Sequence, residues 1–257
     1  MEWEYVYGEG NFNPDIAMNI QPTLDSTIYL TGLTPNTSYT IYVRTYCDVN
    51  DQSAWSDALS FRTDCSVHSL PIIENFDGIG SGSNAYPFCW SRSDNYSAST
   101  QYPYVNSSYH HSGNGSLYFN CSSTTYNLAV LPAIDPNINP IGNLTLSFYM
   151  KTNSGISNAI LIIGAISDPN DINSFIPIDT ITDPLLTFEY YEIPLSSYTG
   201  DAAYVAMKYL SSRDFFYLYV DDITLDVTAT CPIPLHLSST ATTSSSVTLS
   251  WTPGGNE

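Results

Sequence analysis

The chain has 257 residues, a formal net charge of -19 and 21 tyrosines, while only 12% of its residues are charged. Such an acidic surface repels phosphate backbones and anionic lipids, which excludes nucleic acid and membrane surfaces as favoured partners and leaves cations as better ones. The aromatic, Lys-poor composition is typical of secreted β-rich proteins.

The first part of the chain contains short segments with the alternation of half-buried strands, at residues 2–7, 27–31 and 39–45. A run from Leu33 to Tyr39, Leu-Thr-Pro-Asn-Thr-Ser-Tyr, precedes the third strand. This run resembles the tyrosine corner of fibronectin type III domains, in which the tyrosine hydroxyl bonds back to the preceding loop. Residues 1–65 are therefore similar to the second half of such a domain.

The central part of the chain, residues 66–229, contains many strand segments separated by turn signals at the intervals of a β-sandwich. The expected strands lie at residues 70–77, 116–119, 128–131, 144–150, 159–166, 188–193 and 203–209. No segment predicts a long amphipathic helix, and residues 170–175 predict one short helical turn.

A longer strand is expected at residues 214–226, and its alternation contains one fault. Its apolar residues change parity at Asp221-Asp222. A single-residue β-bulge there would return all the apolar side chains to one face. They are Phe216, Leu218, Val220, Ile223 and Leu225.

Residues 230–257 resemble the first two strands of a fibronectin type III domain, with Trp251 as the core tryptophan. Met1 leads directly into Glu-Trp-Glu without a signal peptide. We interpret both ends as cut within neighbouring repeats of a longer tandem array. Our hypothesis is that residues 231–257 complete the sandwich begun by residues 2–63, within one chain or between chains, with Cys47 paired to Cys231.

Several short motifs in the central domain together resemble the jelly-roll modules of the cleaved-adhesin group, which is related to MAM domains and occurs in gingipain haemagglutinin/adhesin regions. The motifs are Glu74-Asn-Phe-Asp77, Cys89-Trp90, His111-Ser-Gly113, Val130-Leu-Pro132, Leu144-Thr-Leu-Ser-Phe148, Tyr204-Val-Ala206 and Tyr219-Val-Asp-Asp-Ile223. The expected fold is all-β: a central jelly-roll β-sandwich plus a fibronectin type III-like sandwich split between the termini. The resemblance implies a secreted or cell-surface bacterial protein that binds extracellular protein or glycan.

The resemblance also implies a structural Ca²⁺ that joins the first and last strands of the central domain, because this ion takes several hard oxygen ligands. The candidate ligands are Glu74, Asp77 and Asp222, with Asp221 as an alternate. The simpler interpretation is that these are solvated acids at strand ends. The segment after the tryptophan, residues 91–96, has few acids, so a second metal site is not expected.

Aromatic residues in and before the loop 96–111 are candidates for ligand binding, because exposed rings stack on sugars or anchor proteins. The candidates are Trp90, Tyr102, Tyr104 and Tyr109. The alternative, which we favour, is that the loop aromatics pack on the sheet and pin the loop. His110-His111 has no evident third partner for a metal, and adjacent strand residues point to opposite faces.

The five cysteines contain no CxxC pair typical of a zinc site. Related modules carry one Cys before the first strand and another before the Trp, which implies a Cys65–Cys89 bridge. Cys121 then remains as a buried thiol within a predicted strand.

The sequence predicts no enzyme. Neither G-x-S-x-G nor a phosphate-binding G-x-x-x-x-G-K-[ST] motif is present. Glu74 with Glu189 or Glu192 could imitate a glycosidase pair, but such pairs arise by chance in an acidic chain. The alternatives to an adhesin are a structural spacer between functional domains and a carbohydrate-binding module of a larger glycan-degrading enzyme.

Overall fold

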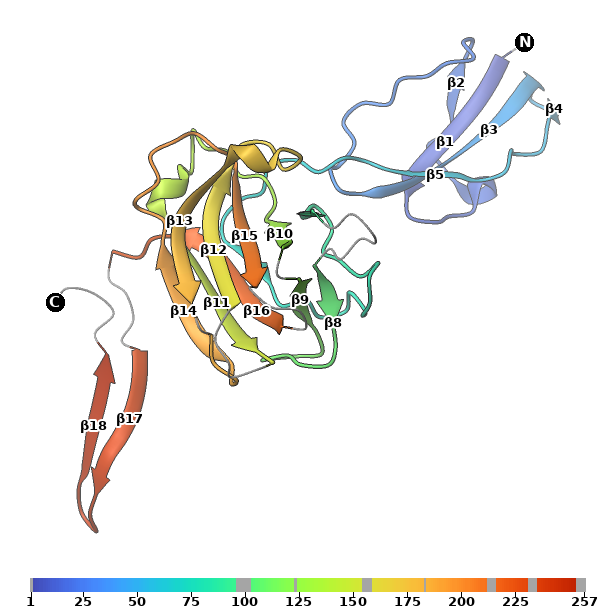
Figure 1. Cartoon of the computed structure of the whole chain (residues 1–257). Helices are drawn as coiled ribbons and strands as arrows, with labels where there is room; N and C mark the ends of the chain where they lie inside the picture. Colours follow the sequence, from blue (N-terminus) through green and yellow to red (C-terminus); the bar gives the residue numbers. More distant parts are fainter. Residues whose placement is uncertain are drawn as a thin grey trace. The chain divides into compact units, whose positions relative to one another are not determined.

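The computed structural model describes residues 2–95, 103–122, 124–153, 159–182, 184–211, 216–230 and 235–252, and is almost entirely β (Figure 1). The chain divides into two compact units, residues 1–67 and 68–257. In the described ranges, every helix is too short or too polar to span a membrane.

The first unit is a single antiparallel sheet with strand order β2-β1-β3-β4, and β5 also pairs with β3. Its elements are β1 (Glu2–Glu9), η1 (Pro14–Ile16), β2 (Gln21–Thr23), β3 (Ser38–Asp48), β4 (Asp51–Gln52) and β5 (Leu59–Arg62). The strand predicted at residues 27–31 is wrong, because these residues pair with no neighbour and Tyr29 is 91% exposed. β-propensity without a sheet edge to pair with does not make a strand.

Tyr39 makes the contact that the sequence predicted for it. Its hydroxyl accepts a hydrogen bond from the backbone N–H of Thr34 at 2.9 Å, and its ring is buried against Phe61. This contact ties the loop before β3 to the sheet.

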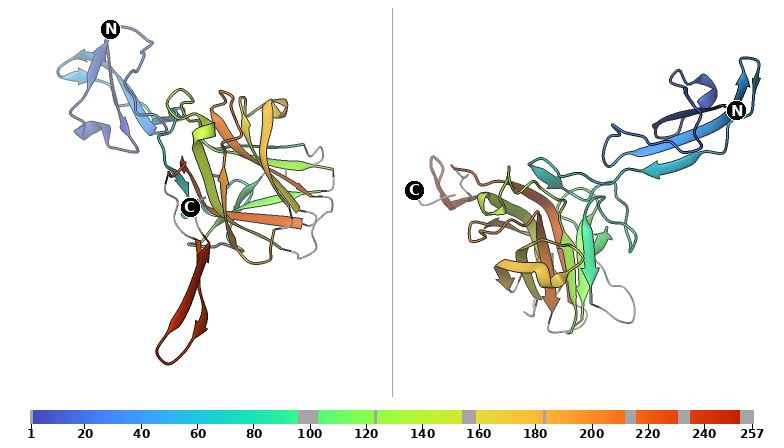
Figure 2. Two further views of the ribbon diagram at one scale, coloured as in Figure 1. Left: turned by 90° about the vertical axis from the view of Figure 1, so that its left-hand side faces the viewer. Right: turned by 90° about the horizontal axis from the view of Figure 1, so that it is seen from above.

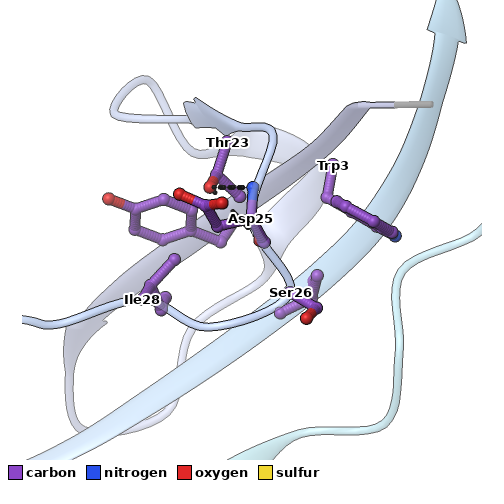
Figure 3. A pocket seen from close by; sticks show the side chains of 7 residues that line it. Trp3, Thr23, Asp25, Ser26 and Ile28 are labelled. Carbon is purple, nitrogen blue, oxygen red and sulfur yellow. Dashed lines mark hydrogen bonds between the residues drawn. The ribbon is translucent and has the colours of Figure 1, made fainter.

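One face of the first unit's sheet contains a cavity of about 200 Å³ (Figure 3). The walls are Trp3, Tyr5, Thr23, Asp25, Ser26, Ile28 and Val43. β1 and β3 pair Tyr5 with Val43, so both side chains lie on this face. Thr23 caps the loop below the cavity, because its Oγ1 accepts the N–H of Asp25 at 3.1 Å.

The second unit is a sandwich of two antiparallel sheets, shown from two further directions in Figure 2. One sheet has the order β13-β12-β15-β10-β7 and the other β14-β11-β16-β9-β8, with β6 on the edge of β16. The strands are β6 (Ile72–Glu74), β7 (Ser91–Asp94), β8 (Tyr104–Asn106), β9 (Ser116–Cys121), β10 (Tyr126–Val130), β11 (Leu144–Thr152), β12 (Ala159–Ile166), β13 (Phe175–Thr182), β14 (Glu189–Pro194), β15 (Tyr204–Ser211) and β16 (Phe216–Val227). Two short 3₁₀ turns are η2 (Ile141–Asn143) and η3 (Ile172–Ser174), the latter within the predicted helical turn.

The core lies between these two sheets and contains apolar residues from both. Phe148 on β11 and Leu161 on β12 are fully buried, as the alternation of each strand requires. The predicted all-β sandwich is therefore confirmed for the central domain. Strands β7, β8 and β13 were not predicted, since they are short or have mostly exposed, weakly alternating residues.

The predicted bulge in the strand β16 is confirmed. Ser147 of β11 pairs with Thr224 and Tyr149 pairs with Asp221, so β16 has one extra residue at this point. Asp222 takes a left-handed conformation with φ 49°, which Asp tolerates better than most residues. As a result, the apolar residues on both sides of the bulge enter the core.

Cys65 and Cys89 are both disulfide-bonded, in agreement with the predicted bridge. Cys121 is a buried thiol, also as expected, and Cys47 is an exposed free thiol. Cys231 lies outside the described residues, so its pairing with Cys47 stays a prediction.

The C-terminal part of the described chain is a two-stranded hairpin, β17 (Leu235–Thr242) and β18 (Val247–Thr252). The side chains of β18 are all exposed. The fibronectin type III-like sandwich expected from the two ends of the chain stays a prediction.

Candidate functional site

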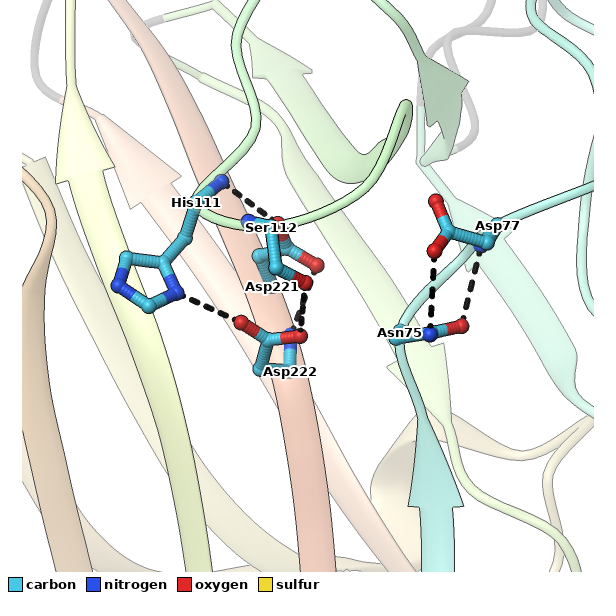
Figure 4. A network of polar contacts seen from close by, with 6 residues as sticks. All are labelled: Asn75, Asp77, His111, Ser112, Asp221 and Asp222. Atoms are coloured by element: carbon cyan, nitrogen blue, oxygen red, sulfur yellow. Dashed lines mark hydrogen bonds and ion pairs between the residues drawn. The ribbon is translucent and has the colours of Figure 1, made fainter.

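An acidic seam lies where the edge strand β6 meets the bulge of β16 (Figure 4). We define it as Glu74, Asp77, Asp221 and Asp222. Glu74 is the last residue of β6 and pairs with Ile223, next to the bulge. The sequence correctly predicted that these acids of the first and last strands lie together.

Asp221 is fully buried and binds the loop that precedes β9. Its Oδ2 accepts the backbone N–H groups of His111 at 2.6 Å and Ser112 at 3.1 Å (Figure 4). Its Oδ1 accepts the N–H of Asp222 at 2.8 Å. A buried carboxylate needs such donors, because an unpaired buried charge is costly.

Asp222 binds the side chains of the same two loop residues. Its Oδ2 lies 2.6 Å from His111 Nδ1, and its Oδ1 accepts the Ser112 hydroxyl at 2.6 Å. An ionised carboxylate can only accept, so this hydrogen bond requires the His111 tautomer in which Nδ1 is the donor. The bulge therefore aims two adjacent carboxylates at one short loop segment.

Asp77 holds the end of this loop. Its Oδ1 accepts the backbone N–H of Asn114 at 2.6 Å. Gly113 has φ 53°, and a Cβ at this position would overlap the Asp77 carboxylate. This close approach explains why the His-Ser-Gly motif ends in glycine.

The carboxylates of the seam are close enough to oppose one another's ionisation. Burial raises the pKa of Glu74, the Phe76 N–H lowers it, and the nearby charges of Asp221 and Asp77 raise it further. Burial also raises the pKa of Asp221, against the lowering effect of its three N–H donors. The seam thus concentrates negative charge that a cation would offset.

The described residues do not, however, present a ready metal site. No three acidic, His or Cys side chains within those ranges are grouped as metal ligands. Oxygens of Asp77, Asp221 and Asp222 are instead bonded to N–H and O–H donors of the loop. The Ca²⁺ ligand set stays a prediction, and the bonds in hand show these acids anchoring a loop.

The outer face of the sheet β14-β11-β16-β9-β8 is covered by aromatic side chains, which we call the aromatic face. It consists of Tyr104, Tyr109, His111, Tyr118, Tyr149, Phe188, Tyr190, Tyr217 and Tyr219. The strand residues occupy alternate positions opposite to core residues. Tyr149, for example, lies between Phe148 and Met150, which are both fully buried.

The rings of the aromatic face touch in two groups, and Lys151 Nζ lies over one ring of each, Tyr109 and Phe188. One group contains Tyr104, Tyr109, Tyr118, Tyr217 and Tyr219, and the other contains His111, Tyr149, Phe188 and Tyr190. Tyr104 of β8 lies 4.9 Å from Tyr118 of β9, and Tyr118 lies 5.3 Å from Tyr219 of β16, between ring centroids. Tyr109 packs edge-on against Tyr219 at 5.0 Å. Edge and tilted contacts at these distances are favourable for aromatic pairs.

His111 connects the acidic seam to the aromatic face. Its ring stacks on Tyr149 with centroids 3.5 Å apart, while its Nδ1 and backbone N–H are held by Asp222 and Asp221. The Tyr149 ring also contacts Tyr190, with the two centroids 5.3 Å apart. The seam therefore sets the position of the loop that contributes Tyr109 and His111.

Charged groups lie among the rings. Lys151 Nζ sits 4.2 Å from the centroid of the Tyr109 ring, in a cation–π arrangement. The Tyr190 hydroxyl donates to Glu192 Oε2 at 3.1 Å. Tyr109 is 49% exposed, so the face offers ring surface, a cation and a carboxylate to solvent together.

The residues predicted to bind a ligand have different outcomes in the structure. Tyr104 and Tyr109 belong to the aromatic face, where they pack on the sheet as the alternative interpretation expected. Tyr102 lies outside the described residues. Trp90 is wrong as a ligand contact, because it is 9% exposed and packs in the core against Phe76 and Tyr86.

Several residues of the aromatic face were missed in the sequence. Tyr149, Tyr190 and Tyr219 lie within strands whose position was correctly predicted. The alternation of apolar residues in each strand indicates that these side chains point outward. It does not indicate that they lie close to one another, because that depends on the order of strands in the sheet.

Comparisons with known proteins give a fold but no family assignment. No protein-family model and no curated protein matches the chain. The K2 cleaved adhesin domain of Lys-gingipain has a TM-score of 0.50 and 14% identity, covering 62% of this chain and 100% of that domain. The K1 domain from Porphyromonas gingivalis W83 has a TM-score of 0.47 and 18% identity, covering 63% and 100%. A family 22 carbohydrate-binding module of Clostridium thermocellum Xyn10B has a TM-score of 0.39 and 16% identity, covering 62% and 93%.

The likeness to the K2 domain shows that the chain shares a β-sandwich fold with that cleaved adhesin domain, as the sequence motifs had predicted.

Proposed function

We propose that the chain is a non-catalytic, extracellular binding module and that its aromatic face contacts the ligand. The two groups of touching rings on one outer sheet face carry this proposal. Tyr109 is 49% exposed and offers ring surface to a ligand, while Tyr118 and Tyr219, 7% and 4% exposed, pack against the neighbouring rings and hold them in place. The two ligand classes that suit such a surface are glycans and extracellular proteins.

The chemistry of the aromatic face fits either class. Tyrosine rings give rigid apolar contact area, and their hydroxyls pair with polar groups of a ligand. Glu192 and Lys151 add an acceptor and a donor beside the rings. A sugar would use the rings as stacking platforms, whereas a protein would anchor its own side chains between them.

The disulfide supports a location outside the cytoplasm. Bridges such as the one that includes Cys65 and Cys89 persist in oxidising compartments and are rare in reducing ones. A module secreted or displayed on the bacterial surface would also meet the proposed ligands there.

The arrangement of carboxylates does not favour the one catalytic pair that the sequence suggested. Glu192 lies on β14 and Glu74 on β6, and two further strands, β11 and β16, lie between them. Three strand spacings separate the two backbones by about 14 Å. Glycosidase carboxyl pairs lie roughly 5–9.5 Å apart.

The proposal is tested by screening the purified chain against a glycan array and a panel of extracellular matrix proteins. We expect binding that Tyr104→Ala and Tyr109→Ala each weaken. Tyr29→Ala is the matched control, since Tyr29 is 91% exposed and lies in the other unit. A glycan-only or protein-only response identifies the ligand class. Binding that survives both face variants, or no binding at all, contradicts the proposal, and the latter favours the structural spacer.

A further inference from the structure

The aromatic face is adjoined at one end by an exposed pair of leucines. Leu185 and Leu186 lie in the loop between β13 and β14 and are 55% and 52% exposed. The loop is held at the end of β11, because the carbonyl oxygen of Leu185 accepts the backbone N–H of Thr152 at 2.8 Å. Phe188 follows in the same loop and belongs to the aromatic face through its contact with His111. The surface beside the rings is therefore aliphatic on this side.

We infer that the ligand of the aromatic face is a basic protein segment that also carries apolar side chains, and not a glycan. This inference rests on the proposed function, because it names the ligand class for the same surface. The exposed leucines, the position of Lys151 and the charge of the sheet each support it.

Exposed leucines favour a protein over a sugar. Aliphatic side chains gain free energy when a ligand removes their apolar surface from water, and the hydroxyl groups around a sugar ring offer little apolar surface in return. Neighbouring exposed apolar groups are instead typical of surfaces that bind proteins. Leu185 and Leu186 would pack against apolar side chains of the partner.

The ring surface that a sugar would need is partly occupied. Tyr109 is the most exposed tyrosine of the aromatic face, at 49%. One side of its ring is taken by Lys151, whose Nζ lies 4.2 Å from the ring centroid, and Tyr219 packs against it at 5.0 Å. A sugar would have to displace the ammonium group to stack on that side. A protein side chain can contact the exposed ring edge without displacing it.

The charge of this sheet favours a basic partner. The strands β6, β8, β9, β11, β14 and β16 contain six acidic residues and one basic residue, Lys151. The acidic residues are Glu74, Glu189, Glu192, Asp221, Asp222 and Asp226. Positive groups of a partner are attracted to such a surface, whereas a neutral glycan gains nothing from its charge.

The Tyr190 ring and Glu192 together offer a place for an arginine of the partner. The Tyr190 hydroxyl donates to Glu192 Oε2 at 3.1 Å, so ring and carboxylate lie side by side on the aromatic face. The planar guanidinium of arginine stacks on aromatic rings and also donates hydrogen bonds to carboxylates. Lys151, which lies over Tyr109 and Phe188, shows that rings of this face already hold a cation.

The test is the binding of synthetic peptides to the purified full chain, measured by isothermal titration calorimetry. One peptide alternates leucine with arginine, a second leucine with glutamine, and a third serine with arginine. We expect the leucine–arginine peptide to bind most tightly and the other two about tenfold more weakly, because each lacks one kind of contact. Its affinity should also fall as sodium chloride is raised, because salt screens exposed charges.

Two variants remove the two kinds of contact separately. Glu192→Gln removes the charge but keeps an acceptor for the Tyr190 hydroxyl. It should weaken the leucine–arginine peptide about threefold or more and leave the leucine–glutamine peptide unchanged. Leu186→Ser should weaken the leucine–arginine peptide by a similar factor and leave the serine–arginine peptide unchanged.

Each variant has a matched control on β13, which belongs to the other sheet of the sandwich. Asp179→Asn removes one exposed acidic charge there, as Glu192→Gln does on the aromatic face. Ile176→Ser removes an apolar side chain that is 51% exposed, close to the 52% of Leu186. Both controls should bind the leucine–arginine peptide as tightly as the unchanged chain does.

Three results would overturn the inference. The first is full affinity for the leucine–arginine peptide in both Glu192→Gln and Leu186→Ser. The second is an equal loss in Glu192→Gln and Asp179→Asn, which would show attraction by the net charge alone. The third is a chain that binds a glycan through the aromatic face and none of the peptides, which would leave the proposed function intact. A chain that binds no glycan, matrix protein or peptide contradicts the proposed function itself, and this inference with it.

Discussion

The backbone N–H of His111 donates to Oδ2 of Asp221 at 2.6 Å, across 110 positions of the chain. The carboxylate of Asp221 is fully buried, yet the residue stands beside the aromatic face, since its partner across the sheet is Tyr149. The bond therefore links the bulge of β16 to the loop that brings Tyr109 and His111 onto the sheet.

Asp221→Ala should loosen this loop and destabilise the second unit. Truncation leaves the N–H groups of His111, Ser112 and Asp222 without their acceptor, and each buried unsatisfied donor costs about 1–3 kcal/mol. We expect a loss of about 2–4 kcal/mol in the free energy of unfolding in urea, with faster amide exchange in residues 109–114. Asp221→Asn, which keeps an acceptor oxygen, should lose less. Equal losses in both variants would show that charge, and not hydrogen bonding, holds the loop.

The same substitution should weaken ligand binding without touching the ligand. If the aromatic face binds as proposed, Asp221→Ala misplaces Tyr109 and His111, so affinity should fall while Tyr104 and Tyr118 stay in place. Amide exchange of residues 109–114 and ligand affinity should both be measured on Asp221→Ala. The comparison shows whether the loss of affinity accompanies the loosened loop. Unchanged affinity with a loosened loop would remove Tyr109 and His111 from the contact surface.

Calcium is tested by the melting temperature in chelator and in excess Ca²⁺. We propose that the ion, if bound at the acidic seam, offsets repulsion between Glu74 and its neighbours Asp77 and Asp221. We expect a higher melting temperature in Ca²⁺, by about 2–4 °C for each kcal/mol gained. An unchanged melting temperature would mean that the calcium prediction is wrong.

Glu74→Gln separates the two roles of the seam. The glutamine can still accept the Phe76 N–H, which Glu74 Oε1 accepts at 2.7 Å, but it carries no charge. In chelator the variant should melt higher than the unchanged chain, because repulsion with Asp77 and Asp221 is gone. In Ca²⁺ it should gain less than the unchanged chain does. The opposite order in chelator would show that the carboxylate charge itself stabilises the turn.

The seam illustrates how far sequence reasoning reaches at this site. The parity switch at Asp221-Asp222 was sufficient to predict the bulge, because a period of two makes any extra residue visible. The juxtaposition with Glu74 followed from the motif resemblance, and the pairing of Glu74 with Ile223 confirms it. The role of Ser112 was not predictable, since it binds Asp222 only after the loop returns to the sheet.

The position of Trp90 could not be predicted from the sequence. An aromatic residue beside a Ser- and Tyr-rich loop was interpreted as a surface contact, but Cys89 has φ 70° and the chain there turns Trp90 into the core. Nothing in the local pattern indicates that turn. The strand order that joins Tyr104, Tyr118 and Tyr219 was equally absent from local patterns, since sheet neighbours come from distant parts of the chain.

High pH should destabilise the second unit through its buried tyrosines. Burial raises the pKa of Tyr219 to about 12, and it also raises that of Tyr118. Above pH 10, the ordinary pKa of tyrosine, the unfolded chain releases these phenolic protons, whereas the folded chain keeps them because the pKa is raised there. The free energy of unfolding should therefore fall as pH rises from 10 towards 12.

Tyr219→Phe should make this fall shallower, because the variant has no phenol to titrate there. Lys208 has the opposite effect on stability, because burial lowers its pKa and the folded chain releases that proton before the unfolded chain does. Its contribution to the free energy of unfolding stops changing once pH exceeds 10.5, the ordinary pKa of lysine. Urea unfolding at several pH values above 10.5, together with tyrosinate absorbance, would check the prediction. A flat profile in the unchanged chain would show that these hydroxyls ionise freely.

Tyr39→Phe tests the tie between loop and sheet in the first unit. The substitution removes one hydroxyl and leaves the Thr34 N–H, which lies 2.9 Å from it, without that acceptor. The ring contact with Phe61, at 5.7 Å between centroids, is retained. We expect a loss of about 1–2 kcal/mol in the free energy of unfolding of the first unit, because the bonded pair is only partly buried and water can compensate in part.

Tyr29→Phe is the control, since this ring is 91% exposed and its hydroxyl should contribute nothing. The two units can unfold separately, so unfolding should be followed by amide exchange of residues in β1 and β3, where the effect of Tyr39→Phe must appear. An effect of equal size in Tyr29→Phe would mean that the Tyr39–Thr34 bond does not hold the loop.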